Sequence, residues 1–276
     1  MLQEKSMDQD NVDYKNQAFW DELCGSGLAK SIGITDASPS SLAKFDEVYL
    51  SFYPYLLGYL ESRSAPNDRL LEIGLGYGTL SSCLMQKGIY YGLDIAEGPV
   101  AMVAERARRE GQSPENVQVG SALSIPHGSN FFGSVYSIGC LHHTGDLKRS
   151  ISEVHRTLAP GGQAVVMLYN RLSYRQLFQA PVKRMKEFRS AGWKVGRETV
   201  RGMYDSNSQG EAAPHTDYIT VLGAHRLFRH FSEVRVEIRN FDHLTLMKGR
   251  LHWSREQLLN NMGRVLGLDL YITAIK

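Results

Sequence analysis

Residues 70–79 of this 276-residue chain read Leu70-Leu71-Glu72-Ile73-Gly74-Leu75-Gly76-Tyr77-Gly78-Thr79. The apolar start predicts a short buried strand, and the three alternating glycines predict a sharp turn, because glycine readily adopts positive φ. Apolar residues then recur at helical spacing (Leu80, Cys83, Leu84), and Thr79 is the predicted N-cap of that helix. A strand, a glycine turn and a helix N-terminus with unpaired N–H groups together predict a binding site for a nucleotide-like ligand.

Two kinds of ligand fit such a corner. A dinucleotide site typically has G-x-G-x-x-G, in which the third glycine lets the helix pack closely on the sheet. In this chain that position is Thr79, and the spacing is G-x-G-x-G. Glu72 also stands two residues before the first glycine. A carboxylate there would repel a pyrophosphate, but it suits a ligand that carries an ammonium and a sulfonium. A nicotinamide-dependent oxidoreductase is therefore disfavoured.

The pattern E-x-G-x-G-x-G resembles the first motif of class I S-adenosylmethionine (SAM) dependent methyltransferases. Two later segments agree with it, L-H-H-x-x-D at 141–146 and L-x-P-G-G at 158–162, the second followed by an apolar strand. Their order closely resembles small-molecule methyltransferases of the ubiquinone-biosynthesis-like branch (methyltransferase type 11), over residues 68 to 170. The resemblance implies an α/β fold with a Rossmann-like, doubly wound sheet of seven strands, mostly parallel with one antiparallel strand. It also implies SAM as cofactor and S-adenosylhomocysteine as product.

The expected cofactor contacts lie after three strands. Asp94 ends the strand predicted at 88–95, where its carboxylate can accept both ribose hydroxyls or, alternatively, cap the next helix. Ser121 stands where methyltransferases resembling this one often place an aspartate on the adenine amino group. A backbone N–H of Ala122 or Leu123 can still contact the ring. The predicted cofactor-binding residues are Glu72, Gly74, Leu75, Gly76, Gly78, Thr79, Asp94, Ile95, Ser121, Ala122, Leu123 and Gly139.

The chain divides by composition into three parts. Residues 1–16 are polar and predict a disordered tail. Residues 17–66 predict a helical cap, in which the aromatic segment 45–57 is helical and breaks near Pro54. Tyr49 and Tyr53 are four residues apart and either face one pocket or pack as core. Residues 67–276 form the predicted methyltransferase domain, with an insertion at 171–222 that roofs the acceptor pocket. Its later strands are predicted at 116–120, 132–139, 163–169, 234–239 and 268–275.

Composition excludes several classes of protein. The net charge is +2 and 42% of residues are hydrophobic, which is ordinary for a globular chain. Three cysteines (Cys24, Cys83, Cys140) lie far apart and predict neither a disulfide framework nor a metal site. The N-terminus carries no apolar signal region, and no apolar run approaches the length of a membrane span. We therefore expect a cytoplasmic protein that does not bind membranes.

Histidines are the candidate general bases, because an imidazole titrates near neutral pH. His142 and His143 follow the fourth strand, beside the expected methyl position, and His143 is slightly favoured. The alternative is that both orient the loop or cap the next helix. His215, with Asp217 beside it, is a further candidate, because the insertion can lower it onto the acceptor.

The acceptor is less well defined by the sequence. Ser137-Ile138-Gly139-Cys140 stands where exocyclic-amine DNA methyltransferases carry [DN]-P-P-[YF], so nucleic acid is an unlikely substrate. Residues 171–201 hold nine basic side chains against two acidic ones, which form either a solvated helical face or a site for a carboxylate or phosphate. The prediction is methyl transfer to oxygen, nitrogen or sulfur of a small molecule. The alternatives are a binding module without catalysis and an enzyme acting on an anionic or nucleic-acid substrate.

Overall fold

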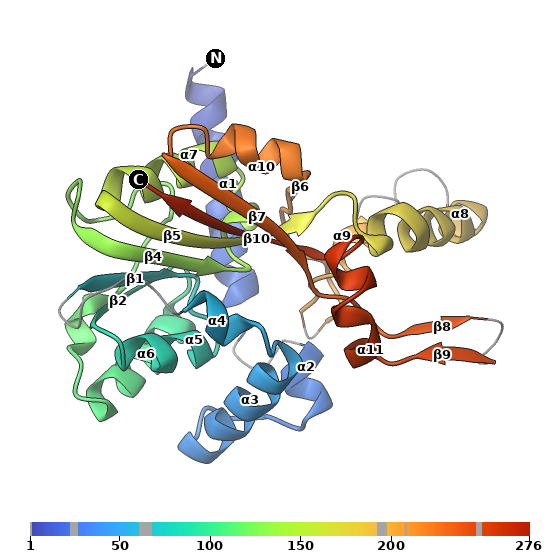
Figure 1. Ribbon diagram of the computed structural model, residues 1–276, viewed down its shortest axis with the longest axis horizontal. Helices are drawn as coiled ribbons and strands as arrows, with labels where there is room; N and C mark the ends of the chain where they lie inside the picture. The colour runs from blue at the N-terminus through green and yellow to red at the C-terminus, as the bar shows by residue number, and fades with distance from the viewer. Residues whose placement is uncertain (1, 23–26, 61–67, 192–197, 208, 247–249) are drawn as a thin grey trace.

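The computed structural model describes residues 2–22, 27–60, 68–191, 198–207, 209–246 and 250–276 (Figure 1). A twisted sheet crosses the molecule in the order β3-β2-β1-β4-β5-β10-β7, and the short β6 pairs with β5. Only β10 runs antiparallel to its neighbours in this sheet, as the seven-stranded prediction required. The strands are β1 (Arg69–Ile73), β2 (Ile89–Asp94), β3 (Val117–Val119), β4 (Phe132–Ile138), β5 (Leu158–Asn170), β6 (Tyr218–Ile219), β7 (Glu233–Arg239) and β10 (Asp269–Ile275).

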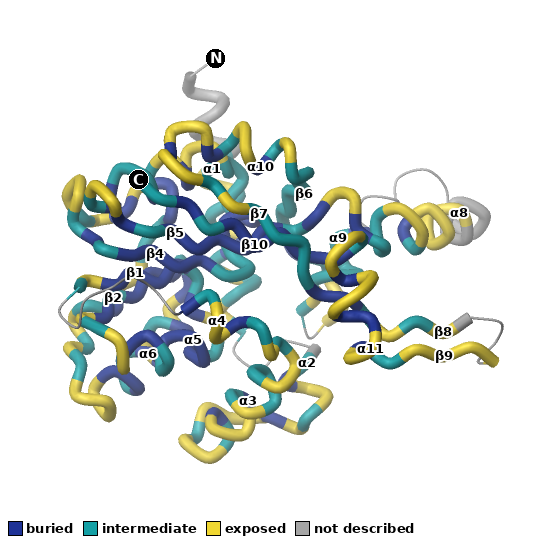
Figure 2. The backbone as a smooth tube through the Cα atoms, viewed as in Figure 1, coloured by how far each residue is buried: buried dark blue, intermediate teal, exposed yellow. Residues whose placement is uncertain are grey.

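Helices cover both faces of the sheet, as expected for a doubly wound fold. Leu71 and Val135 point to the face covered by α7 and α10, whereas the next residues in the strands, Leu70 and Tyr136, point to the face covered by α5 and α6. This alternation follows from the two-residue period of a strand. Figure 2 shows the buried strands between the two helical layers. The helices are α5 (Thr79–Met85), α6 (Glu97–Arg109), α7 (Leu147–Thr157) and α10 (Val221–Leu227).

The N-terminal segment is described as a helix, where the sequence predicted a disordered tail at 1–16. Helix α1 (Leu2–Trp20) lies along the loop that follows β4. The amide of Asn16 donates to the carbonyl of His143 at 2.7 Å, and the amide of Gln9 donates to the carbonyl of Thr144 at 2.7 Å. Polar side chains make these contacts, so the segment needs no apolar face. Its sequence therefore lacks the apolar periodicity from which a helix is predicted.

The cap over the sheet is helical and breaks near Pro54, as predicted. Its helices are α2 (Gly27–Ser31), α3 (Pro39–Phe52) and α4 (Leu56–Tyr59). Asp46 of α3 forms an ion pair with Arg106 of α6 at 2.7 Å and accepts a hydrogen bond from the Thr79 hydroxyl at 2.6 Å. The prediction that Thr79 is the N-cap of α5 is wrong, because Gly78, with φ of 75°, occupies that position. The Thr79 side chain instead links α5 to α3 of the N-terminal helical cap.

The insertion after β5 carries a π-helical turn (Arg175–Gln179), α8 (Ala180–Ala191) and α9 (Glu198–Arg201). A second excursion, between β7 and β10, was not predicted. It forms a hairpin of β8 (Leu244–Leu246) and β9 (Leu251–Trp253), followed by α11 (Arg255–Leu259). Figure 1 shows α8 and this hairpin extending from the same side of the molecule. Within the described parts of the chain, no helix has the length and apolarity needed to span a membrane. Cys24 and part of the basic segment, 192–197, lie outside the described residues.

Candidate active site

The glycine corner is held in shape by Asp94. Gly74, Gly76 and Gly78 have φ of 84°, 50° and 75°, which L side chains rarely adopt. One Asp94 carboxylate oxygen accepts the Leu75 N–H at 2.7 Å, and the other accepts the Ala96 N–H at 3.0 Å. The acid therefore joins the corner after β1 to the residue that precedes α6, and it also lines a cavity. Its contact with ribose hydroxyls stays a prediction.

A cavity of about 170 Å³ lies against the corner at the carboxyl ends of β1, β2 and β4. It brings together seven of the predicted cofactor residues: Gly74, Gly76, Asp94, Ile95, Ser121, Ala122 and Gly139. Helix α1 closes it with Asp13, Asn16 and Trp20, which sequence reasoning missed. The Oδ1 atom of Asn16 is buried and has no hydrogen-bond partner among the described residues. A free acceptor on the same cavity as Asp94 fits a ligand that donates hydrogen bonds, as the hydroxyls and amino group of an adenosine do.

The loop after β3 is organised by Ser121. Its hydroxyl accepts the Leu123 N–H at 3.2 Å, so that N–H, one of the two predicted to contact the ring, is already engaged. Leu123 lines neither cavity described here, whereas Ala122 lines the smaller one. Of the two backbone groups predicted to contact adenine, Ala122 is therefore the better placed.

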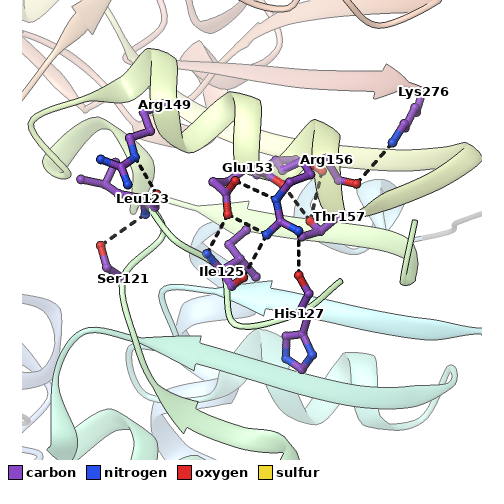
Figure 3. A network of polar contacts seen from close by, with 10 residues as sticks. Ser121, Leu123, Ile125, His127, Arg149, Glu153, Arg156, Thr157 and Lys276 are labelled. Atoms are coloured by element: carbon purple, nitrogen blue, oxygen red, sulfur yellow. Dashed lines mark hydrogen bonds and ion pairs between the residues drawn. The ribbon is translucent and has the colours of Figure 1, made fainter. Parts of the chain in front are cut away.

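Helix α7 fixes the same loop from behind (Figure 3). Arg149 donates to the carbonyl of Leu123 at 2.8 Å, and the Glu153 carboxylate accepts the Ile125 N–H at 2.9 Å. The Arg156 guanidinium donates to the carbonyls of Ile125 and His127 at 3.0 and 2.7 Å. Because these backbone groups are all paired, the loop that borders the cavity is pre-organised.

Glu72 lies beneath the corner and lines a second, larger cavity. It is 1% exposed, and one of its oxygens accepts hydrogen bonds from the hydroxyls of Ser81 and Tyr90, both at 2.6 Å. Burial raises the pKa of Glu72 to about 8, more than these hydrogen bonds lower it. Without a cationic ligand, the side chain is therefore largely protonated at neutral pH.

Replacing Glu72 with glutamine is expected to stabilise the protein at alkaline pH. The raised pKa means that the wild type loses stability as pH rises from 4.5 to about 8, since the unfolded chain releases this proton first. The advantage of Glu72→Gln should grow from near zero at pH 5 to on the order of 3–5 kcal/mol at pH 9. Urea denaturation at both pH values measures it, with exposed Glu233→Gln as control. A stability gain that does not change with pH would contradict the raised pKa of Glu72.

The larger cavity, of about 490 Å³, continues from the smaller one on the side of the cap and the insertion. Glu72, Leu75 and Thr79 of the predicted cofactor set line it, and Gly78 lines neither cavity. Aromatic residues of the cap, including Tyr49 and Tyr53, face it. The two cavities share six lining residues: Trp20, Gly74, Gly76, Pro99, Ile138 and Gly139.

The three predicted histidines lie close together but differ in access. His142 is fully buried, lines neither cavity and packs its ring 4.1 Å from that of Tyr169. His143 lines the smaller cavity, and its Nδ1–H donates to the backbone carbonyl of His215 at 2.7 Å. The side chain of His215 lines neither cavity and pairs with Asp217 at 3.2 Å. His215 therefore reaches His143 through its backbone and not through its ring.

Sequence reasoning missed the carboxylate beside His143. Asp205, in the loop after α9, lines the larger cavity and lies with its Oδ2 atom 3.6 Å from Nε2 of His143. The Tyr169 hydroxyl lies 2.9 and 3.1 Å from the two Asp205 oxygens and donates to them. Burial raises the pKa of Asp205 and lowers the pKa of His143, so the two groups compete for one proton. The segment 203–210 showed only a loop, and nothing local in it indicates which strand end Asp205 reaches.

Comparison with known proteins supports a methyltransferase domain. Residues 71–166 match the sequence family described as "Methyltransferase domain". Phosphoethanolamine N-methyltransferase 2 of Caenorhabditis elegans is 27% identical over 38% of this chain and 25% of its own length. Demethylmenaquinone methyltransferase of Symbiobacterium thermophilum is 29% identical over 37% of this chain and 43% of its own. This chain thus spans less than half of either relative.

The fold has also been solved in other proteins. The structure of a SAM-dependent methyltransferase from Methanosarcina mazei matches with a TM-score of 0.51 and 20% identity, covering 81% of this chain and 97% of that one. The sheet order, the glycine corner and the family match define a class I SAM-dependent methyltransferase domain. SAM is the cofactor of this class of domain, as the motifs predicted.

Proposed function

We propose that this protein transfers the methyl group of SAM to a nitrogen, oxygen or sulfur atom of a small molecule. The observation that carries the proposal is the pair of joined cavities. The smaller one has the acceptors Asp94 and Asn16 at the glycine corner, and the larger one opens from it toward the cap and the insertion. This arrangement suits a cofactor in the first cavity and an acceptor molecule in the second.

The bound cofactor supplies a methyl group already activated on a positive sulfur. The protein must therefore position the acceptor atom, and well-oriented reactants can lower a barrier by about 7–11 kcal/mol. Asp205 lines the larger cavity and is held by Tyr169, so it is the group placed to take a proton from the acceptor. His143 behind it can share that proton through Nε2. General-base catalysis of this kind contributes about 10²–10⁴-fold.

The two relatives described above support a small acceptor without selecting it. One is a phosphoethanolamine N-methyltransferase and the other a demethylmenaquinone methyltransferase. Their acceptors differ widely in polarity, and they align with only 38% and 37% of this chain. The cavity itself, with its five tyrosines and its carboxylates, is the better guide to the acceptor.

Calorimetric titration with S-adenosylhomocysteine and, in parallel, with NADH tests the proposal. We expect micromolar binding of the first and none of the second. Asp94→Asn should weaken S-adenosylhomocysteine at least about 10-fold, because an amide replaces two of the acceptor lone pairs with donors and removes the charge. Glu233→Gln, an exposed carboxylate on β7, is the matched control and should bind as the wild type does. Tight NADH binding would overturn the methyltransferase proposal.

A further inference from the structure

The larger cavity holds more acidic than basic side chains. Five carboxylates line it: Glu22, Glu72, Asp205, Asp242 and Asp269. Among the described lining residues, Arg175 is the one basic side chain, and it is already paired. Its Nε and Nη2 atoms donate to the two oxygens of Asp242 at 2.7 and 2.8 Å. The described part of the basic segment therefore places no unpaired cation on this cavity, and the anion site that the sequence offered as one interpretation of that segment is not found among these lining residues.

Asp269 is a buried carboxylate without a cationic partner of its own. It begins β10, opposite Tyr169 of β5, and is 2% exposed. Asn240 donates a hydrogen bond to it at 2.9 Å, and Arg255 reaches only as far as Asn240, also at 2.9 Å. Among the described residues, no Lys, Arg or His nitrogen lies within 4 Å of its oxygens.

Asp205 is in a similar position. Among the described residues, the basic nitrogen within 4 Å of its oxygens belongs to His143, whose pKa burial lowers, and Arg175 acts on Asp205 only from farther away. A buried carboxylate is costly unless a cation or several hydrogen bonds compensate it. Two such groups lining one cavity indicate that the compensating charge comes with the ligand.

Aromatic rings surround the same space. Tyr49 and Tyr53 of the cap lie with their ring centroids 4.8 Å apart, and Tyr169 and Tyr204 lie 4.6 Å apart on the insertion side. Tyrosine faces attract cations, with a gain of about 0.5–2 kcal/mol that is largest where water is excluded. Carboxylates and tyrosine rings on one cavity wall are the chemistry that recognises an ammonium group.

We infer that the methyl acceptor is an amine, bound as its ammonium form between Asp205, Asp269 and the tyrosines of the larger cavity. The inference rests on the proposed function and narrows it to N-methylation. The ammonium first gives a proton to Asp205, which shares it with His143. The nitrogen lone pair then forms the new N–C bond as the C–S bond breaks, and that electron pair leaves with sulfur, so the sulfonium becomes a thioether and the product is an N-methylammonium.

The inferred amine site also predicts how amine binding depends on pH. Burial raises the pKa of Asp269 to about 7, and a bound ammonium favours its ionised form. Amine binding should therefore tighten as pH rises through 7, while the amine itself stays protonated. The charged and titratable groups that face Asp269 are Arg175, Arg255, Asp205 and the tyrosines Tyr49, Tyr53, Tyr55, Tyr169, Tyr204 and Tyr271.

A matched library of primary amines, alcohols and carboxylates on common aryl and alkyl frameworks tests the inference. Phenethylamine, 2-phenylethanol and phenylacetate form one such set. Each is titrated into the full chain saturated with S-adenosylhomocysteine, and methylated products are sought by mass spectrometry with SAM. We expect at least about 10-fold tighter binding of amines than of their alcohol and carboxylate counterparts. If the protein binds the alcohols or carboxylates more tightly than the amines, or binds no amine at millimolar concentration, the inference that the acceptor is an amine is wrong.

Asp269→Asn should remove the preference for amines and the tightening above pH 7. The variant keeps the acceptor for Asn240 and removes a buried charge, so it is expected to fold. S-adenosylhomocysteine binding is the control that separates the two conclusions. If the wild type fails to bind it, the proposed function is wrong whatever the amine series gives. If it binds and amines are not preferred, only the acceptor assignment fails.

Discussion

Gly74→Ala is expected to weaken S-adenosylhomocysteine binding by at least about 100-fold and to lower the melting temperature. A Cβ added at Gly74 would lie 2.3 Å from the Cβ of Cys140, so the two loops that bound both cavities must move apart. The φ of 84° adds about 1–2 kcal/mol of backbone strain for a non-glycine residue, and forced overpacking about 1–3 kcal/mol more. Calorimetric titration and thermal unfolding measure both effects.

Two variants separate the clash from the strain. Gly111 has φ of 73° with nothing within 4 Å of an added Cβ, so Gly111→Ala imposes similar strain far from the site and should leave binding unchanged. Cys140→Gly in the Gly74→Ala background removes the clashing atom and should recover part of the affinity. If Gly74→Ala binds as the wild type does, the corner is not the cofactor site.

Asp205→Asn is expected to lower kcat by about 10²–10⁴-fold, the usual contribution of a positioned base. An amide cannot take the proton that Asp205 and His143 share across 3.6 Å. Burial raises the pKa of Asp205, so wild-type kcat should rise with pH as this pair loses its proton, and the variant should lose that rise. Steady-state rates over pH 6–9 with labelled SAM, on an acceptor that the compound library yields, give the profile.

Histidine variants serve as the comparison. His143→Ala should lower kcat less than Asp205→Asn, because the carboxylate stays in the cavity. His215→Ala should be close to wild type, since His143 contacts the backbone carbonyl of His215 rather than its ring. A loss in His215→Ala equal to that in Asp205→Asn would assign the base to His215 instead. Wild-type turnover in Asp205→Asn and all three histidine-to-alanine variants would rule out every base considered.

The sequence predicted the main strands of the central sheet well, because each is marked by apolar residues within it and by turn residues beside it. The apolar run before Gly74 became β1, and the segments ending at Asp94 and Gly139 became β2 and β4, within a residue or two at each end. The same local signals placed seven predicted residues on one small cavity. Parallel strands end at the same edge of a sheet, so motifs at strand ends converge whatever their distance along the chain.

Tertiary structure alone decided the rest of the site. Asn16 reaches His143 across 127 positions of sequence through a single side-chain amide, and such a contact leaves no periodic signal. Asp205 sits in a loop whose sequence says nothing of its destination, yet the path of the insertion brings it to Tyr169 and His143. The sequence by itself determined the sheet and the cofactor corner, because strands and glycine turns depend on neighbouring residues. Which side chains line the acceptor cavity depends on how distant segments pack, and only the folded chain fixes that.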